Sequence, residues 1–174
     1  MTKFYLTENN KEREVHFDVS FLPMLISGAE GSGTSFFSVS LISSLALQGL
    51  PVVFYSLKSQ ARLLFEEQIG DRKNDKDIVS IESGNTELAQ KTFSEFAPNN
   101  KHVLFIKNAE TVLTKELLAV VEKSDKLILS GDLSRSLLQK YVDEKKFATT
   151  IVMDNRKGYL VNKNTQGIIR VENE

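Results

Sequence analysis

One stretch of the chain restricts its fold more than any other. Residues 22–27 are mostly apolar, residues 28–35 form a glycine-rich turn, and residues 36–48 are apolar nearly all round. Glycines allow backbone N–H groups to turn inward, and the N-terminus of a following helix adds a positive field. A strand, a glycine loop and a buried helix in this order predict an α/β fold with a phosphate-binding loop.

The loop matches the spacing G-x-x-x-x-G-K-[ST] at every fixed position except one. Gly28, Gly33 and Ser35 occupy the glycine and hydroxyl positions, whereas Thr34 stands where the lysine belongs. Ser35 retains the hydroxyl that holds magnesium in such loops, but Thr34 supplies no positive charge. Glu30 adds a carboxylate, which disfavours a polyphosphate unless its side chain points to solvent. The candidate site residues of the loop are Gly28, Glu30, Gly31, Ser32, Gly33, Thr34 and Ser35.

The rest of the chain alternates between apolar runs and segments of helical spacing. Buried strands are expected at 51–56, 77–81, 103–106 and 126–130, with helices at 60–69, 85–96, 113–121 and 133–146. Residues 3–6 and 14–19 predict an N-terminal hairpin with Val15, Phe17 and Val19 on one face, and Leu88 is expected on the inward stripe of its helix. Strands at 149–153, 158–161 and 167–171 predict a closing antiparallel patch. The pattern therefore predicts a mostly parallel, helix-covered sheet.

Composition limits the class of protein. With 174 residues and 41% hydrophobic residues, the chain has the size of one domain, residues 1–174. A net charge of -1 gives no signal for nucleic-acid binding, and the absence of cysteine excludes disulfides and thiolate metal sites. The longest apolar segment, residues 36–47, is interrupted by serines and too short to span a membrane. We expect a cytoplasmic location, with any membrane link made by parts of a larger chain.

The order of the segments resembles the FtsK/HerA group of P-loop motor ATPases, which move DNA or protein. The matching segments are 21–35, 54–58, 103–108 and 127–132. The ending, with Gly158-Tyr159-Leu160 and residues 167–171, looks most like the last ATPase-type domain of EssC/EccC proteins, the coupling ATPases of type VII secretion. The resemblance implies a RecA/FtsK-like P-loop NTPase fold. It also implies that nucleotide chemistry is often lost in such domains while substrate or partner binding remains.

A second motif of the FtsK/HerA group carries a positive residue in this chain where the group has acidic residues. The resemblance implies an aspartate that positions magnesium and a glutamate that polarises water after the strand at 103–106, but Lys107 and Asn108 stand there. With the loop lysine also missing, we predict no catalytic residues, no bound metal and at most weak ATP and magnesium binding. An alternative is that Lys107 replaces the loop lysine while Asp132 or Glu110 serves magnesium.

Two functions of different classes follow from these motifs. The first is a catalytically degenerate docking or regulatory module that binds secreted proteins or neighbouring ATPase domains of the same chain. The second is an active or nucleotide-sensing NTPase, including a RecA/KaiC-like one, which residues 49–62 also resemble; there Lys58 fills the position of the required glutamate base. A third alternative treats residues 28–33 as a simple strand-to-helix turn of a different α/β fold.

Overall fold

The structure is a computed structural model that describes residues 2–132 and 142–173. Its strands form one ten-stranded sheet in the order β2-β1-β10-β9-β8-β3-β7-β6-β4-β5. The strands are β1 (Thr2–Glu8), β2 (Lys11–Val15), β3 (Met24–Ser27), β4 (Val52–Tyr55), β5 (Ile78–Ser80), β6 (Val103–Lys107), β7 (Leu127–Gly131), β8 (Thr149–Asp154), β9 (Lys157–Asn162) and β10 (Thr165–Asn173).

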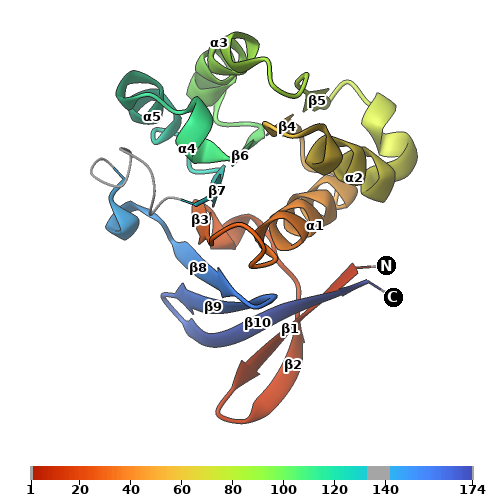
Figure 1. Cartoon of the computed structure of the whole chain (residues 1–174), viewed down its shortest axis with the longest axis vertical. Helices are drawn as coiled ribbons and strands as arrows, with labels where there is room; N and C mark the ends of the chain where they lie inside the picture. Colours follow the sequence, from red (N-terminus) through yellow and green to blue (C-terminus); the bar gives the residue numbers. More distant parts are fainter. Residues whose placement is uncertain (1, 133–141, 174) are drawn as a thin grey trace.

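Helices connect and cover the strands. The α-helices are α1 (Thr34–Leu47), α2 (Ser59–Ile69), α3 (Thr86–Phe96), α4 (Ala109–Val112) and α5 (Lys115–Val121), and the described 3-10 turns are η1 (Val19–Phe21), η2 (Gly70–Asn74), η3 (Ala97–Asn99) and η6 (Glu144–Lys146). Figure 1 shows α1 and α2 on one side of the parallel strands and α3, α4 and α5 on the other. None of the helices in 2–132 and 142–173 combines the length and apolar character that a membrane-spanning helix needs.

The sheet has a parallel half and an antiparallel half that meet at β8. From β8 through β3, β7, β6 and β4 to β5 every neighbour runs parallel, whereas β8, β9, β10, β1 and β2 pair antiparallel. The parallel strands carry continuous apolar runs such as the fully buried Val103–Ile106 segment of β6, because helices cover both of their faces. Parallel strands covered by helices, with antiparallel strands at the end of the chain, confirm the predicted fold class.

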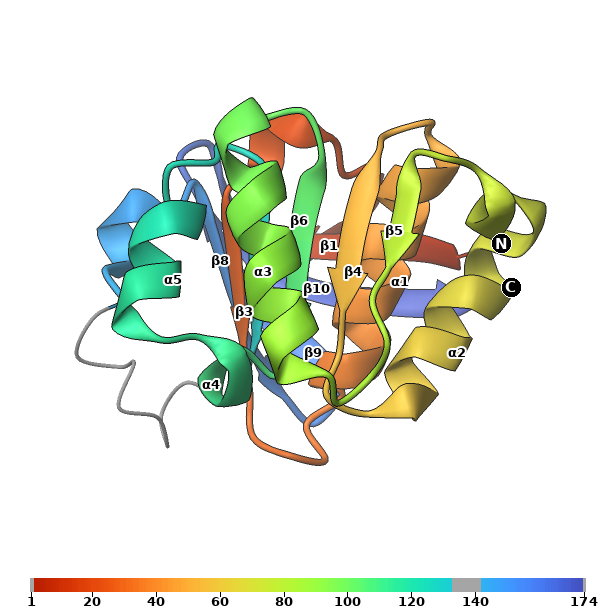
Figure 2. The same cartoon turned by 90° about the horizontal axis from the view of Figure 1, so that it is seen from above.

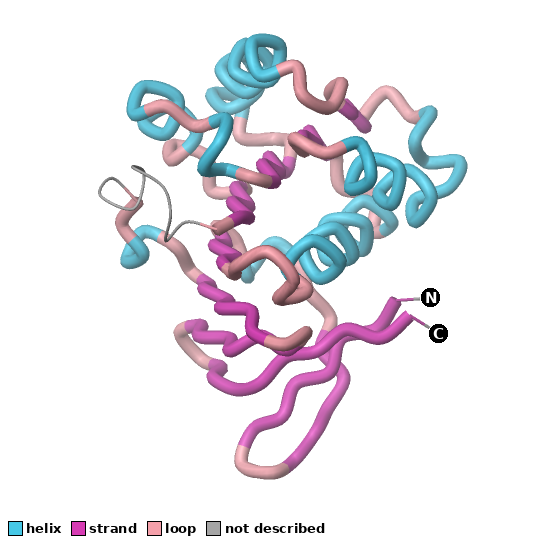
Figure 3. The backbone as a smooth tube through the Cα atoms, viewed as in Figure 1, coloured by secondary structure: helices cyan, strands magenta, loops and turns pink. Residues whose placement is uncertain are grey.

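The antiparallel half bends under α1. Figure 3 shows the strands as one band that turns beneath this helix. Phe37 of α1 packs in an edge-to-face pair with Phe4 of β1, whose ring also meets Phe17. The inner faces of β9 and β10 add Leu160 and Ile169 to the same core. Helix α1 is therefore apolar nearly all round because one side faces the parallel strands and the other faces the antiparallel strands.

A second core fills the opposite face of the parallel strands. Tyr55 and Leu104 face it from the sheet, and Phe93 of α3 and Leu118 of α5 cover them. On the α1 side, the rings of Phe65, Phe54 and Phe105 stack in series, with centroids 4.3 and 5.0 Å apart. The packed cores hold the carboxyl ends of the parallel strands in a fixed array, and that edge carries the candidate site.

Several local predictions were wrong. The second strand of the N-terminal hairpin ends at Val15 and not at residue 19. The Asp18 side chain accepts a hydrogen bond from Ser20 N–H and starts η1. Val19 lies in η1 and is 43% exposed, instead of sharing a face with Phe17. Leu88 of α3 is 41% exposed instead of lying on the inward stripe.

The helix predicted at 113–121 is present as α5, which begins two residues later than predicted, at Lys115. Thr114 accepts a hydrogen bond from Leu117 N–H and caps α5, and α4 precedes it. The helix predicted at 133–146 falls mostly outside the described residues.

Candidate functional site

The predicted loop joins β3 to α1 at the carboxyl edge of the parallel strands (Figure 2). Gly31 and Gly33 adopt left-handed backbone angles, with φ of 84° and 92°. Gly33 is the N-cap residue of α1, and no side chain caps this helix end. The first N–H groups of an α-helix have no carbonyl partner within the helix, so these donors face the space above the loop.

A cavity of about 660 Å³ opens at this edge. It is lined by the loop, by the segment from Ser56 to Lys58 after β4, by the ends of β6 and β7 and by the turn between β8 and β9. The volume is in the usual range for small-molecule and cofactor sites. All the predicted site residues line it except Ser32, which is only 9% exposed.

Thr34 lines the cavity, but its hydroxyl is hydrogen-bonded inside the loop. Its hydroxyl lies 2.7 Å from Ser32 Oγ, and the residue is only 5% exposed. Gly28 makes room for this pair, because a Cβ on Gly28 would overlap Thr34 Oγ1. The position that carries the lysine in other loops of this spacing therefore serves the internal packing of the loop.

Lys107 lies at the end of β6, inside the cavity wall. The residue is 5% exposed. Burial lowers the pKa of its ammonium; the nearby Glu110 carboxylate opposes this shift, and Lys58 adds to it. Removal from water disfavours the charged form of lysine, and a neighbouring carboxylate favours it. The structure thus places a cation of reduced basicity beside the loop.

Asn108 and Glu110 begin the segment that follows Lys107. Asn108 adopts a left-handed conformation, φ 60°, and its side chain does not cap α4. Glu110 Oε2 is buried without a hydrogen-bond partner in the described structure, and a Cβ on Gly131 would overlap its carboxylate. Close approach of Glu110 to β7 therefore requires glycine at 131.

Glu30 and Lys58 pair across the mouth of the cavity. Lys58 Nζ lies 3.4 Å from Glu30 Oε1, and the Glu30 side chain is 89% exposed. An exposed pair of this kind contributes little to stability. The Glu30 carboxylate points to solvent, which removes the objection that its charge would occupy the loop.

The turn between β8 and β9 touches the loop, a contact that sequence reasoning missed. Arg156 donates its backbone N–H to Ser32 O at 2.8 Å, and a Cβ on Gly33 would come within 2.9 Å of Arg156 Cα. Asn155 and Arg156 have φ of 47° and 65°, the left-handed pair of a tight hairpin turn. Two flanking strands around Asn155 signal the hairpin, but no sequence pattern predicts that its tip reaches the loop.

Comparisons with solved structures agree with this arrangement. The cytoplasmic domain of the type VII secretion ATPase EccC from Thermomonospora curvata is 12% identical, with a TM-score of 0.62, and the match covers 99% of this chain and 26% of that one. The conjugation coupling protein TcpA of pCW3, solved with ATPγS, is 10% identical over 98% of this chain and 65% of that one, with a TM-score of 0.58. The chain has the fold of the P-loop ATPases. This confirms the predicted resemblance to FtsK/HerA-type domains at the level of fold.

A solved structure of a different protein matches as well. A KaiC-like protein from Pyrococcus horikoshii is 19% identical over 86% of this chain and 88% of that one, with a TM-score of 0.58. No protein-family model matches the chain, and no curated protein matches it in sequence. The chain spans about a quarter of the length of the EccC structure, 26%. Since these neighbours share so few identical residues, they establish the fold of the chain.

The residues of the cavity do not fit a magnesium nucleotide held in the manner of a P-loop ATPase. Such sites use a loop lysine for the phosphates and an aspartate after a core strand for the metal. Here Thr34 bonds Ser32, and Lys107 stands at the end of β6. The described residues also contain no cluster of three or more His, Asp or Glu side chains that could hold a metal.

Proposed function

We propose that this chain is an ATPase-fold domain that does not hydrolyse nucleotide and that docks a protein partner. The partner is a neighbouring ATPase domain or a secreted protein of a type VII secretion coupling ATPase. In this proposal the domain works in the cytoplasm and reaches the membrane through other parts of a larger chain.

The loss of hydrolysis is supported by the groups at the carboxyl edge of the sheet. Phosphoryl transfer depends on positioning and on charge stabilisation, and one missing group lowers the rate by orders of magnitude. Thr34 brings no charge to the loop, Lys107 has the wrong charge to hold a metal, and Asn108 cannot accept a proton from water.

The observation that carries the docking role is an uncovered apolar face. Side chains of the antiparallel strands alternate, so Ile151, Leu160 and Ile169 face α1 while their neighbours face outward. No described helix covers the outer side (Figure 1). We call the exposed apolar residues of this side the outer face: Val152, Tyr159, Val161 and Ile168, which are 55%, 43%, 40% and 42% exposed.

The outer face is contiguous across three strands. Val152 of β8 is the register partner of Tyr159 on β9, and Tyr159 is the partner of Ile168 on β10. Side chains directly opposite each other on antiparallel strands are in contact distance. Adjacent exposed apolar residues mark protein interaction sites more often than scattered ones do.

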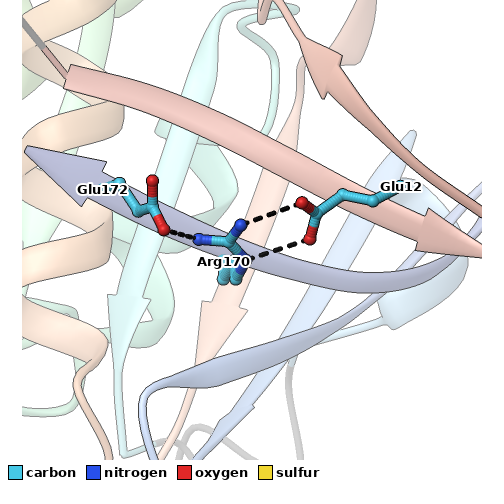
Figure 4. Close-up of polar contacts among 3 residues, drawn as sticks. All are labelled: Glu12, Arg170 and Glu172. Atoms are coloured by element: carbon cyan, nitrogen blue, oxygen red, sulfur yellow. Dashed lines mark hydrogen bonds and ion pairs between the residues drawn. The ribbon is translucent and has the colours of Figure 1, made fainter.

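The charged end of the same sheet side is already paired with itself. Arg170 donates from Nη2 and Nε to the two Glu12 carboxylate oxygens at 3.0 and 3.1 Å, and it also pairs with Glu172 (Figure 4). Its guanidinium lies 4.6 Å from the ring centre of Tyr5. These groups satisfy one another, so the apolar outer face is the part of this surface left for a partner.

The secretion context is supported by the match to EccC, which covers 99% of this chain. The share of EccC that is matched, 26%, agrees with one domain of a larger machine in which neighbouring domains are available as partners. This part of the proposal comes from similarity of fold and from the resemblance of the sequence motifs.

Two measurements on purified protein test the proposal. Phosphate release from ATP with magnesium should stay at the rate seen without protein. Binding to the purified ATPase domains and secreted proteins of the same secretion system should weaken about tenfold or more in the variant with Tyr159→Thr and Val161→Thr, because the centre of the outer face loses its apolar contacts.

Leu63→Gln is the matched control, since Leu63 is 62% exposed on α2 and lies outside the outer face. Binding by this variant should equal that of the unchanged chain. Phosphate release above background would refute the loss of hydrolysis. Equal binding by the double variant, or self-association that the double variant abolishes, would refute docking of a different protein.

A further inference from the structure

Lys107 is a buried cation, and no described group accepts a hydrogen bond from its ammonium. It is 5% exposed, it lines the cavity, and neither the described hydrogen bonds nor the described ion pairs within 2–132 and 142–173 include it. Lysine is almost never so buried unless it has a partner. A buried lysine in the wall of a cavity, with no partner among the described residues, therefore indicates an anionic ligand.

The charged groups around Lys107 leave its ammonium available to such a ligand. Glu110 of α4 supports the charged form from nearby, and Lys58 opposes it. Lys58 itself pairs with Glu30 at the mouth, and Asp132 and Arg156 complete the charged lining. Lys107 is thus the buried cation of the cavity wall, and the carboxylate that favours its charge does not hydrogen-bond to it.

The loop and the start of α1 line the same cavity with groups of the kind that bind phosphate at helix N-termini. The N-terminus of α1 has no side-chain cap, and the loop before it holds Gly31 and Gly33 in left-handed conformations. The Thr34 hydroxyl is bonded to Ser32, so Thr34 brings no cation to this part of the cavity. The uncapped N–H groups and Lys107 face the same cavity from two different elements.

We infer that this cavity binds a polyphosphate group without magnesium, with Lys107 of β6 as its cation in place of the missing loop lysine. This inference depends on the proposed function in one respect, which is that the bound polyphosphate is not hydrolysed. A metal dication beside Lys107 meets the repulsion of its ammonium, so added magnesium competes with the protein for the phosphates. Binding of this kind makes the domain a sensor of polyphosphate.

The experiment uses calorimetric titration of the whole chain with ATP and with inorganic pyrophosphate, each in EDTA and in excess magnesium. Both ligands should bind in EDTA, and magnesium should weaken the binding. Lys107→Met should weaken binding in EDTA by about tenfold or more, the value of one lost charge-assisted hydrogen bond. The Met variant keeps a side chain of similar length and removes a buried charge, so it should fold at least as well as the unchanged chain.

Lys101→Met is the matched control, because Lys101 precedes the same strand at its other end and is exposed. This variant should bind both ligands as the unchanged chain does. A readout independent of any variant is chemical labelling of lysine amines, in which bound ATP should protect Lys107 and leave Lys101 reactive.

The outcomes separate this inference from the proposed function. No binding in EDTA, binding that magnesium strengthens, equal binding by Lys107→Met, or labelling of Lys107 unaffected by ATP would each overturn the inference and leave the docking role standing. Phosphate release from ATP would overturn the proposed loss of hydrolysis, even if ATP binds in EDTA and protects Lys107 from labelling.

Discussion

Replacing Gly33 with alanine tests how the β8–β9 turn holds the loop. Gly33 has φ 92°, and a Cβ there would lie 2.9 Å from Arg156 Cα. The nearest atom belongs to the backbone, so no change of rotamer relieves the contact. The turn must move away from the loop, and the hydrogen bond from Arg156 N–H to Ser32 O, 2.8 Å long, is the first interaction to lengthen.

The size of the effect follows from two contributions. An alanine held in the left-handed region costs about 1–2 kcal/mol. Loss of the hydrogen bond and of the packing around it adds about 1–2 kcal/mol. The sum, about 2–4 kcal/mol, corresponds to a fall in Tm of about 4–16 °C for a chain of this size.

Gly31→Ala is the matched control for this variant. Gly31 has φ 84°, and a Cβ there would meet nothing within 4 Å. It should therefore lose only the conformational contribution of about 1–2 kcal/mol. Urea unfolding followed by far-UV circular dichroism measures both variants, since the chain has no tryptophan. Equal losses at the two glycines would show that the turn does not support the loop.

Two further predictions concern the charge of the cavity. Burial lowers the pKa of Lys107 in the folded chain, so at pH values just below 10.5, the ordinary lysine pKa, the unfolded chain binds more protons than the folded chain. The free energy of unfolding should therefore rise with pH in that window. Urea titrations at successive pH values measure this rise, which should be smaller in Lys107→Met. Thr34→Lys should tighten ATP binding in EDTA by about fivefold or more, because a second cation faces the phosphates, while phosphate release stays at background because Asn108 still supplies no base. Hydrolysis by Thr34→Lys would contradict the account of the β6 end.

Much of the fold could be predicted because its signals are local. Helix α1 and strand β6 are continuous apolar segments bounded by turn residues, and Gly49 adopts the left-handed conformation, φ 95°, expected after the last turn of α1. The predicted boundaries failed where a single polar side chain redirects the backbone. Asp18 does so at η1 and Thr114 does so at α5.

The candidate site was less predictable because its decisive contacts join segments distant in sequence. Spacing alone identified the loop, and Lys107 and Asn108 followed from their place after a strand. That Arg156 touches the loop depends on β8 lying beside β3, a pairing that periodicity does not encode. The hydrogen bond between Thr34 and Ser32 depends on side-chain geometry within the loop.

The two ends of the ten-stranded sheet influence how the molecule behaves in concentrated solution. Strand β5 has only three residues, and β2, at the other end, reads Lys-Glu-Arg-Glu-Val with its first four residues exposed. Short strands and charged side chains discourage further strands from adding to an open sheet. The architecture therefore resists growth into fibrils by strand addition even though it leaves an apolar surface uncovered.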